Sequence, residues 1–215
     1  MTPETTVFVV DDDAAVRQAL SWLIESVGLR VEAFASAQEF LDAHPESDLA
    51  GCLVLDVRMP GLSGLELQAK LAAQGAGLPV IILTGHAEVP MAVQALKAGA
   101  VDFFEKPVSE QKLLDRIQQA LEQDARDRLR RAGRAEVRAR LARLTARERQ
   151  VLGLVVAGKS NKEMASELGV TTKTIEAHRA QIMRKLEAES LAELVRLSLS
   201  ADNGPGLGLG DSQQM

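Results

Sequence analysis

Cysteine, tyrosine and long apolar runs are what this sequence has least of. It contains one cysteine, no tyrosine and 3% aromatic residues. Cys52 has no partner, so an intramolecular disulfide is excluded, and we expect a small core residue in a reducing compartment. Scarce aromatics argue against a stacking surface for single-stranded nucleic acid. The chain starts without a signal-peptide pattern, and no apolar stretch approaches the about 18 residues that cross a bilayer. We therefore expect a soluble, cytoplasmic protein without a membrane segment.

Charged residues are plentiful but unevenly distributed. Residues 1–121 carry 8 Lys and Arg against 17 Asp and Glu, residues 122–144 carry 8 against 4, and residues 145–215 carry 9 against 9. The formal net charge of −5 therefore hides an acidic first half and a basic middle. With 215 residues, 46% of them hydrophobic, the chain is long enough for one large domain or two small ones.

The first part of the chain alternates strand and helix signals, which is typical of an α/β sheet. Short apolar runs predict strands at residues 7–10, 31–34, 52–56, 79–84 and 101–105. Amphipathic patterns predict helices at residues 14–27, 37–43, 64–73 and 89–98, and a further helix from residue 110. Ser63 is a predicted helix cap, and the pairs Ser36 with Glu39 and Thr145 with Glu148 have the spacing of capping boxes.

Polar side chains follow these apolar runs at the same end of the predicted strands. Asp11 and Asp12 follow the first run, Asp56 and Thr84 end the third and fourth, and Lys106 follows the fifth. In an open parallel sheet such strand ends line one crevice. Neighbouring carboxylates repel by roughly 1 to 4 kcal/mol, and together with carbonyl oxygens and waters they suit Mg2+. Asp56 is the natural nucleophile because a carboxylate can form an aspartyl phosphate. The bond that precedes Pro107 is predicted to be cis.

The series Asp11, Asp12, Asp56, Thr84 and Lys106 resembles the receiver domain of two-component response regulators, over about residues 5–121. That resemblance implies phosphotransfer to Asp56 from a sensor histidine kinase, with Mg2+ bound by Asp11, Asp12, Asp56 and the backbone of Arg58. It implies a flavodoxin-like fold, an α/β doubly wound five-stranded parallel sheet in the order 2-1-3-4-5. Thr84 and Phe103 are implied as switch residues that alter the face of the fourth helix and fifth strand. Core packing is the simpler role for Phe103, and both roles are compatible.

Two other interpretations of the acidic site carry less weight. A haloacid-dehalogenase-type phosphatase also uses a nucleophilic Asp after a strand, but it needs a second Asp where this chain has Arg58. We therefore expect no enzyme, apart from slow autodephosphorylation. Zinc is disfavoured because His44, His86 and His178 lie far apart in the sequence and have no cysteine companions.

The stretch 124–143 is rich in Ala and Arg, with Gly133 as its main turn former, and predicts a continuous helical linker. Its arginines form a solvated face, and an approach to DNA phosphates is the secondary interpretation. From residue 144 onward only helical signals appear, at residues 146–157, 161–168, 172–186 and 191–199.

The second and third of these helices, with a short turn at Gly169, match the helix-turn-helix plan. On the third helix Ile175, Ile182 and Leu186 share one side, and small or polar residues share the other. Candidate phosphate contacts near helix starts are Asn161, Lys162, Thr172 and Thr174. Candidate major-groove residues are Lys173, Glu176, Ala177, Ala180, Gln181 and Arg184. A solvated face, or an interaction module that never binds DNA, is the alternative.

The segments LTARER at 144–149, SNKEMA at 160–165 and TIEAHR at 174–179 resemble the LuxR-type DNA-binding domain, an all-α four-helix unit over about residues 142–200. The whole chain resembles FixJ/NarL-type regulators, and TGHAEVPMAV at 84–93 with GAVDF at 99–103 looks most like the FixJ branch. This resemblance implies a transcription factor that binds double-stranded promoter DNA as a homodimer on phosphorylation, through Leu191, Leu194, Val195 and Ser198. We expect a receiver at 1–121, a linker at 122–143, a DNA-binding domain at 144–200 and a disordered tail at 201–215.

Overall fold

All five predicted strands are present in the computed structural model, which describes residues 5–45 and 49–202. They are β1 Thr6–Val10, β2 Arg30–Phe34, β3 Gly51–Leu55, β4 Val80–Thr84 and β5 Asp102–Glu105. The strands form one parallel sheet in the order β2-β1-β3-β4-β5, which confirms the predicted topology. The chain divides into two compact units, Met1–Arg128 and Leu129–Met215, called the N-terminal and C-terminal units below. The disordered tail predicted at 201–215 is wrong at its first two residues, since Ala201 and Asp202 belong to the last helix, and from residue 203 on it lies outside the described residues.

The helices between the strands also lie where the sequence predicts them. They are α1 Ala14–Ser26, α2 Ala37–Ala43, α3 Gly64–Ala73, α4 Val89–Lys97 and α5 Glu110–Ala142. Helix α5 runs without interruption for 33 residues and includes the predicted linker. Ser63 and Glu66 form a complete capping box at α3.

The capping box predicted at Ser36 is incomplete. The Ser36 hydroxyl accepts a hydrogen bond from the Glu39 N–H, as expected. The Glu39 carboxylate, however, accepts from the Ala35 N–H at 2.7 Å and not from Ser36.

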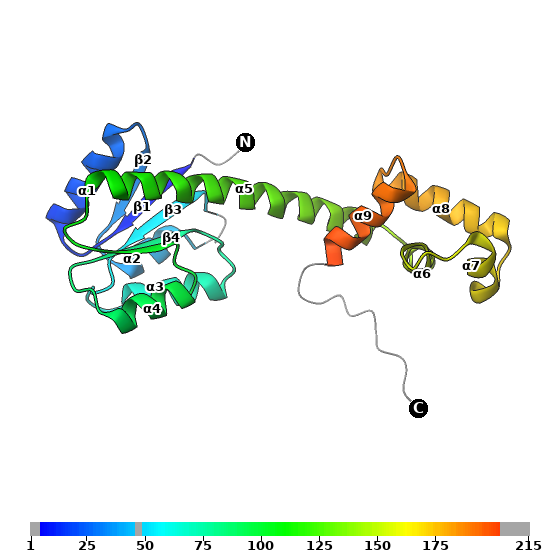
Figure 1. Ribbon diagram of the computed structural model, residues 1–215, viewed down its shortest axis with the longest axis horizontal. Helices are drawn as coiled ribbons and strands as arrows, with labels where there is room; N and C mark the ends of the chain where they lie inside the picture. The colour runs from blue at the N-terminus through cyan, green and yellow to red at the C-terminus, as the bar shows by residue number, and fades with distance from the viewer. Residues whose placement is uncertain (1–4, 46–48, 203–215) are drawn as a thin grey trace, which may run out of the picture. The chain divides into compact units, whose positions relative to one another are not determined.

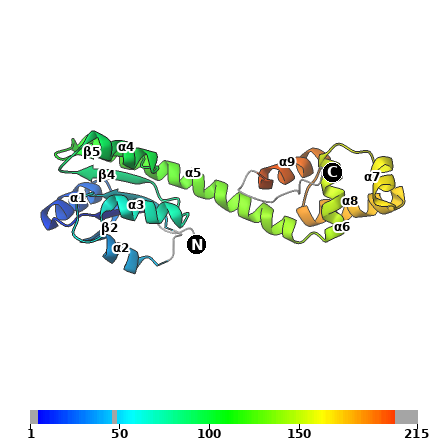
Figure 2. The same cartoon turned by 90° about the horizontal axis from the view of Figure 1, so that it is seen from below.

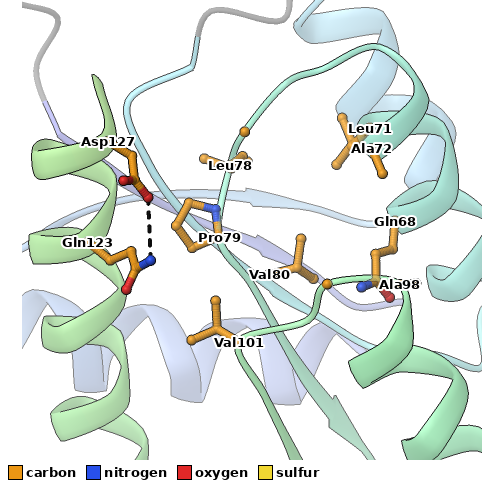
Figure 3. Close-up of a pocket in the computed structure, with 12 residues that line it drawn as sticks. Gln68, Leu71, Ala72, Leu78, Pro79, Val80, Ala98, Val101, Gln123 and Asp127 are labelled. Carbon is orange, nitrogen blue, oxygen red and sulfur yellow. Dashed lines mark hydrogen bonds between the residues drawn. The ribbon is translucent and has the colours of Figure 1, made fainter. Parts of the chain in front are cut away.

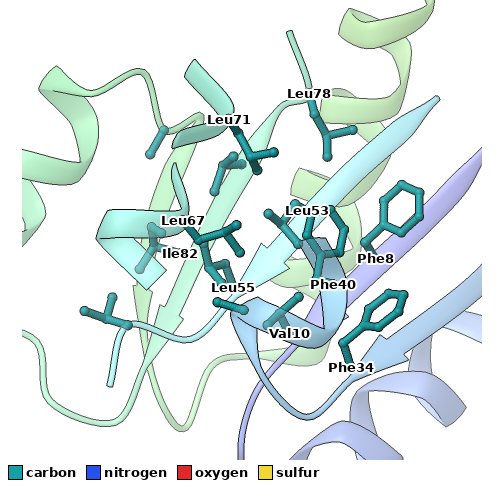
Figure 4. Close-up of a cluster of buried hydrophobic side chains, with 14 of the residues drawn as sticks. Phe8, Val10, Phe34, Phe40, Leu53, Leu55, Leu67, Leu71, Leu78 and Ile82 are labelled. Atoms are coloured by element: carbon teal, nitrogen blue, oxygen red, sulfur yellow. The ribbon is translucent and has the colours of Figure 1, made fainter. Parts of the chain in front are cut away.

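Helices lie on each face of the sheet (Figures 1 and 2), and a cluster of buried hydrophobic side chains fills the space under them on each side. Helices α2, α3 and α4 cover one face, where Phe8, Leu53 and Ile82 pack against Phe40 and Leu67 (Figure 4). Helices α1 and α5 cover the other face and contribute Ile24, Leu113 and Ile117 to a second cluster. The three central strands β1, β3 and β4 are buried on both faces and read as nearly continuous apolar runs, whereas the edge strands β2 and β5 are partly exposed and contain charged residues. Cys52 is fully buried in the second cluster, and burial raises its pKa to about 12, so it is a core residue.

A buried carboxylate on α5 accepts a hydrogen bond from the first residue of β3. Asp124 is 2% exposed, and its Oδ2 accepts a hydrogen bond from the Gly51 N–H at 2.9 Å. Gly51 has φ +142°, and a Cβ there would lie 1.7 Å from the backbone oxygen of Thr6. No other residue type fits at that position, so Gly51 brings the start of β3 close to both β1 and α5.

The C-terminal unit is helical after the end of α5. Helices α6 Ala146–Val156, α7 Asn161–Leu168, α8 Thr172–Leu186 and α9 Leu191–Asp202 surround one hydrophobic core. Thr145 and Glu148 form the predicted capping box at α6. The Glu148 carboxylate also pairs with Lys185 of α8 at 2.7 Å, which ties α6 to α8. Within residues 5–45 and 49–202, no helix has the length and apolar character needed to cross a membrane.

Candidate functional site

The register of the sheet brings the predicted polar residues together at one edge. Val10 pairs with Leu55, so Asp11 and Asp56 follow neighbouring strands at the same level. The Asp56 N–H donates to the Val10 carbonyl at 2.9 Å, and the Lys106 N–H donates to the Thr84 carbonyl at 2.8 Å. A Cβ at Gly64 would lie 2.1 Å from the Asp56 carbonyl oxygen, so glycine allows α3 to begin close beside the site. The peptide bond between Lys106 and Pro107 is cis, as predicted.

Lys106 joins two buried carboxylates. Its Nζ lies 2.5 Å from Oδ2 of Asp11 and 3.0 Å from Oδ1 of Asp56. Asp11 and Asp56 are 2% and 6% exposed, so their charges are largely removed from water. The other Asp56 oxygen, Oδ2, accepts from the backbone N–H of Arg58 at 2.8 Å. Each Asp56 oxygen therefore has one protein donor and keeps a lone pair for a further ligand.

Burial and charge act in opposite directions on this pair. Burial raises the pKa of Asp56 above its ordinary value, and the hydrogen bond and positive charge of Lys106 offset this only in part. Burial alone would lower the pKa of Lys106, but its hydrogen bonds to Asp11 and Asp56 outweigh burial and raise it. The carboxylates therefore hold the ammonium in its charged form, whereas Lys106 only partly offsets the burial that disfavours the charged form of Asp56.

The third predicted carboxylate, Asp12, does not join this cluster. Its side chain is exposed, whereas Asp11 and Asp56 are buried. In the described ranges, no group of three or more His, Cys, Asp or Glu side chains converges as a metal site. The donors available at the strand ends are all oxygens, from the carboxylates and from the backbone of the loop after β3. That donor type suits Mg2+ and excludes a soft-metal site.

The two predicted switch residues lie on β4 and β5. Thr84 is fully buried, and its hydroxyl accepts from the His86 N–H at 3.4 Å. Phe103 is partly buried against the core under α4 and pairs with Ile82 in the sheet. The side chain of Arg58 extends to Glu88, the N-cap residue of α4, with 2.9 Å between Nη2 and Oε1.

A cavity of about 260 Å3 lies at the N-terminal ends of β4 and β5, the edge of the sheet opposite to Asp56 (Figure 3). Leu78 and Pro79 line it just before β4, Val101 lines it before β5, and Asp127 of α5 completes its wall. Asp56 does not line this cavity. The candidate site for a phosphoryl group is the cluster of Asp11, Asp56 and Lys106 at the strand ends, and none of these three residues lines the cavity.

In the C-terminal unit, α7 and α8 form the predicted helix-turn-helix. Gly169 ends α7 in the left-handed conformation with φ 64°, and Thr171 caps α8. Ile175, Ile182 and Leu186 are buried against the core, as predicted. The opposite side of α8 is exposed and carries Lys173, Glu176, Ala177, Ala180, Gln181 and Arg184. The Arg184 guanidinium donates to Gln181 at 2.5 Å, so these two major-groove candidates are paired with each other.

The predicted phosphate contacts lie at the starts of α7 and α8. Lys162 and Thr172 are exposed. Thr174 is half-buried, and its hydroxyl is bonded to that of Thr171 at 2.9 Å. The Asn161 side chain accepts a hydrogen bond from Arg179 at 2.5 Å, a contact that no sequence pattern predicts.

The residues predicted to form a dimer face on α9 divide into two groups. Leu194 is fully buried in the core of its own unit and offers no surface to a partner. It falls inside because α9 itself must cover α6, and Leu194 is the residue that does so. Leu191, Val195 and Ser198 are exposed or half-buried.

A parallel sheet with a buried, lysine-bridged aspartate at its edge, joined to a helix-turn-helix unit, defines a DNA-binding response regulator. Residues 7–118 match the family model for the response regulator receiver domain, and residues 142–198 match that for bacterial regulatory proteins of the luxR family. The chain belongs to the response regulators that carry a LuxR-type DNA-binding domain.

Individual relatives confirm the resemblance to the FixJ branch. The chain is 46% identical over 201 residues to the transcriptional regulatory protein FixJ of Bradyrhizobium diazoefficiens, covering 94% of this chain and 98% of that protein. It is 47% identical over 205 residues to FixJ of Azorhizobium caulinodans, covering 95% and 97%. Among solved structures, the response regulator StyR matches with a TM-score of 0.82 at 47% identity, covering 91% of this chain and 98% of StyR.

Proposed function

We propose that Asp56 accepts a phosphoryl group from a sensor histidine kinase and that this phosphorylation controls DNA binding by the LuxR-type unit. The observation that carries the proposal is the buried Asp56 carboxylate held by Lys106 beside Asp11. A phosphoacceptor needs a nucleophile, a positive charge opposite it and a hydroxyl donor nearby. Asp56, Lys106 and Thr84 supply these three groups at one edge of the sheet.

In the proposed reaction an oxygen of Asp56 attacks the phosphorus of a phosphohistidine. The bond between phosphorus and the imidazole nitrogen breaks, the imidazole leaves with the electron pair, and an acyl phosphate forms on Asp56. The Lys106 ammonium balances the added negative charge, and the Arg58 N–H keeps the attacking carboxylate oriented. Water provides the only other acceptor, so slow autodephosphorylation is the sole turnover that we propose.

Mg2+ fits the oxygen donors at this edge. The carboxylates of Asp11, Asp12 and Asp56 and the backbone carbonyl of Arg58 would hold it. When bound, the ion neutralises charge on the transferring phosphoryl group. Asp12 is exposed, so it would complete the set from the solvent side.

Phosphorylation is proposed to act through Thr84 and Phe103 on the face formed by α4 and β5. The resulting homodimer uses the surface residues Leu191, Val195 and Ser198 of α9 together with that face. The exposed side of α8 then enters the major groove of promoter DNA, and the starts of α7 and α8 contact its phosphates. We propose the domain limits 1–121, 122–143 and 144–200 for the receiver, linker and DNA-binding domain, and the cytoplasm as the site of action.

The test is phosphorylation of the full-length chain by acetyl phosphate with Mg2+, followed by mass spectrometry and analytical ultracentrifugation. Wild type is expected to gain one hydroxylamine-labile phosphoryl group and to shift toward a dimer. Asp56→Asn is expected to do neither. Asp115→Asn, an exposed carboxylate on α5, is the matched control and should behave as wild type. An Asp56→Asn protein that still gains phosphate, or that dimerises when acetyl phosphate is added, would overturn the proposal.

A further inference from the structure

Arg179 and Asn161 connect the two helices of the helix-turn-helix. Arg179 lies on α8 between its buried and exposed sides, and Asn161 is the first residue of α7. The Arg179 Nη1 donates to Asn161 Oδ1 at 2.5 Å, and both residues are half-buried. Among the described residues, Arg179 makes no ion pair. The hydrogen bond of its side chain goes to the neutral amide of Asn161.

This contact determines which way the Asn161 amide points. A guanidinium has only donors, so it can be satisfied only by the amide oxygen. The Asn161 oxygen must therefore face Arg179, and the NH2 group must point the other way. That NH2 group makes no hydrogen bond to any residue that the structure describes, so its two donors are available to a ligand.

The surroundings of this NH2 group favour an anion. Ser160 caps α7 and forms a capping box with Glu163; the carboxylate, which by its charge opposes an anion, is held on the Ser160 N–H at 2.8 Å and leaves the next two N–H groups unoccupied. The backbone N–H groups of Asn161 and Lys162 are in the first turn, where an α-helix has no internal acceptor for them. The exposed Lys162 side chain adds a positive charge at the same helix end. Helix starts of this kind bind phosphate oxygens.

We propose that Arg179 is a positioning residue for a DNA phosphate contact. It does not touch DNA; it fixes the Asn161 amide so that the NH2 group donates to a phosphodiester oxygen at the start of α7. The inference rests on the proposed DNA-contacting role of Asn161. It assigns to Arg179 a role in affinity without a role in base recognition or in charge neutralisation.

The salt dependence of binding separates positioning from direct contact. A cation that neutralises one phosphate contributes about 0.9 to the slope of log affinity against log salt, and a neutral amide contributes nothing. Arg179→Met should therefore weaken binding of full-length protein to a random-sequence DNA duplex several-fold while leaving that slope unchanged. Asn161→Ala should weaken it about tenfold, the loss expected for one hydrogen bond to a charged group, again at unchanged slope. In the double variant the two losses should overlap instead of adding.

Asn161→Asp provides an independent test in case Arg179→Met does not fold. An aspartate keeps the oxygen that Arg179 needs and favours a helix start, so the melting temperature should equal or exceed that of wild type. It replaces the outward NH2 group by an acceptor that repels phosphate, so DNA affinity should fall by at least about tenfold. A purely structural Asn161 would predict only the smaller loss that one added negative charge near DNA causes, and that loss would be screened as the salt concentration rises.

The outcomes are distinct. Additive losses with a slope lowered by about 0.9 for Arg179→Met would mean that Arg179 itself contacts phosphate, and would overturn the inference. An Asn161→Asp protein that binds DNA as tightly as wild type would also overturn the inference about Arg179. In either case, DNA binding by the phosphorylated wild-type protein would leave the proposed function intact. Absence of DNA binding by phosphorylated wild type would instead refute the proposed function.

Discussion

Removal of the Lys106 charge should destabilise the N-terminal unit in a pH-dependent way. In the Lys106→Met protein, Asp11 and Asp56 would lie buried side by side without the ammonium that lies 2.5 and 3.0 Å from them. Removing one partner of a buried ion pair costs about 3 to 5 kcal/mol. Lys106 is 22% exposed, so we expect the lower end, about 3 kcal/mol at pH 7.5. For a unit of this size that corresponds to a decrease of about 10 °C in melting temperature.

The sign of the pH dependence follows from the pKa of Asp56. Burial already raises this pKa, and loss of Lys106 raises it further. A carboxyl with a raised pKa in the folded state contributes stability below its unfolded pKa and loses it as pH rises through the folded pKa. The difference in stability between Lys106→Met and wild type should therefore be largest near pH 7.5 and shrink as the pH approaches about 5.

Trp22 makes this measurable in the full-length chain. It is the only tryptophan, and it lies on α1, so its fluorescence during denaturation reports the N-terminal unit. Lys112→Met, an exposed lysine of the same unit, is the control and should match wild type. A second substitution, Asp56→Asn, should restore part of the stability lost in Lys106→Met, because it removes one of the two buried carboxylate charges and leaves Asp11. An equal loss at pH 5 and pH 7.5, or no rescue by Asp56→Asn, would refute the electrostatic account.

Three further predictions concern stability elsewhere. The Lys185 ammonium and the Thr145 N–H lower the pKa of Glu148 to about 2. The stability that Glu148 contributes is therefore present above about pH 4.5 and lost as the pH falls toward 2. In Glu148→Gln, the stability of the C-terminal unit, followed by NMR, should depend less on pH over this range than in wild type. Gly51→Ala should prevent the N-terminal unit from folding, whereas Gly133→Ala, with nothing within 4 Å of its Cβ, should stabilise α5 by about 0.5 to 1 kcal/mol in thermal melts. Asp124→Ala should cost about 1 to 3 kcal/mol by leaving the Gly51 N–H unpaired, and Asp124→Asn clearly less, in urea titrations.

The sequence predicts the strands and the site at their ends because both depend on local patterns. Apolar runs that end in Asp11, Asp56 and Thr84 predict strand ends, and parallel pairing then brings those ends together. The spacing of residues in the sequence could not predict that Lys106 pairs with both carboxylates, although their opposite charges favour such a pairing. The exposure of Asp12 could have been predicted, because adjacent residues at a strand end point to different sides and only one of Asp11 and Asp12 can then face Asp56.

Other features could be read from the sequence only with hindsight or not at all. Asp124 continues the helical spacing of Leu113, Ile117 and Ala120, all of them buried, so that stripe points to a buried carboxylate. Leu194 shares its spacing with the exposed α9 residues, and only tertiary packing against α6 separates them. The bond from Arg179 to Asn161 spans 18 residues and depends on the angle between α7 and α8, which no sequence pattern specifies.

The charges at the strand ends also set how much free energy phosphorylation can supply. A phosphoryl group on Asp56 adds negative charge next to Lys106, and one unit of charge at about 4 Å is worth about 4 kcal/mol at an effective dielectric constant of 20. A hydrogen bond from the Thr84 hydroxyl to that group adds about 1.5 to 3 kcal/mol. Shifting a two-state equilibrium from 1:99 to 99:1 requires about 5.5 kcal/mol. Only the part of these energies that differs between the two states shifts the equilibrium, and because Lys106 is bonded to Asp56 before phosphorylation, the contact that Thr84 would gain is the state-dependent one. Loss of the Thr84 hydroxyl should accordingly leave Asp56 able to accept phosphate but unable to convert most of the population.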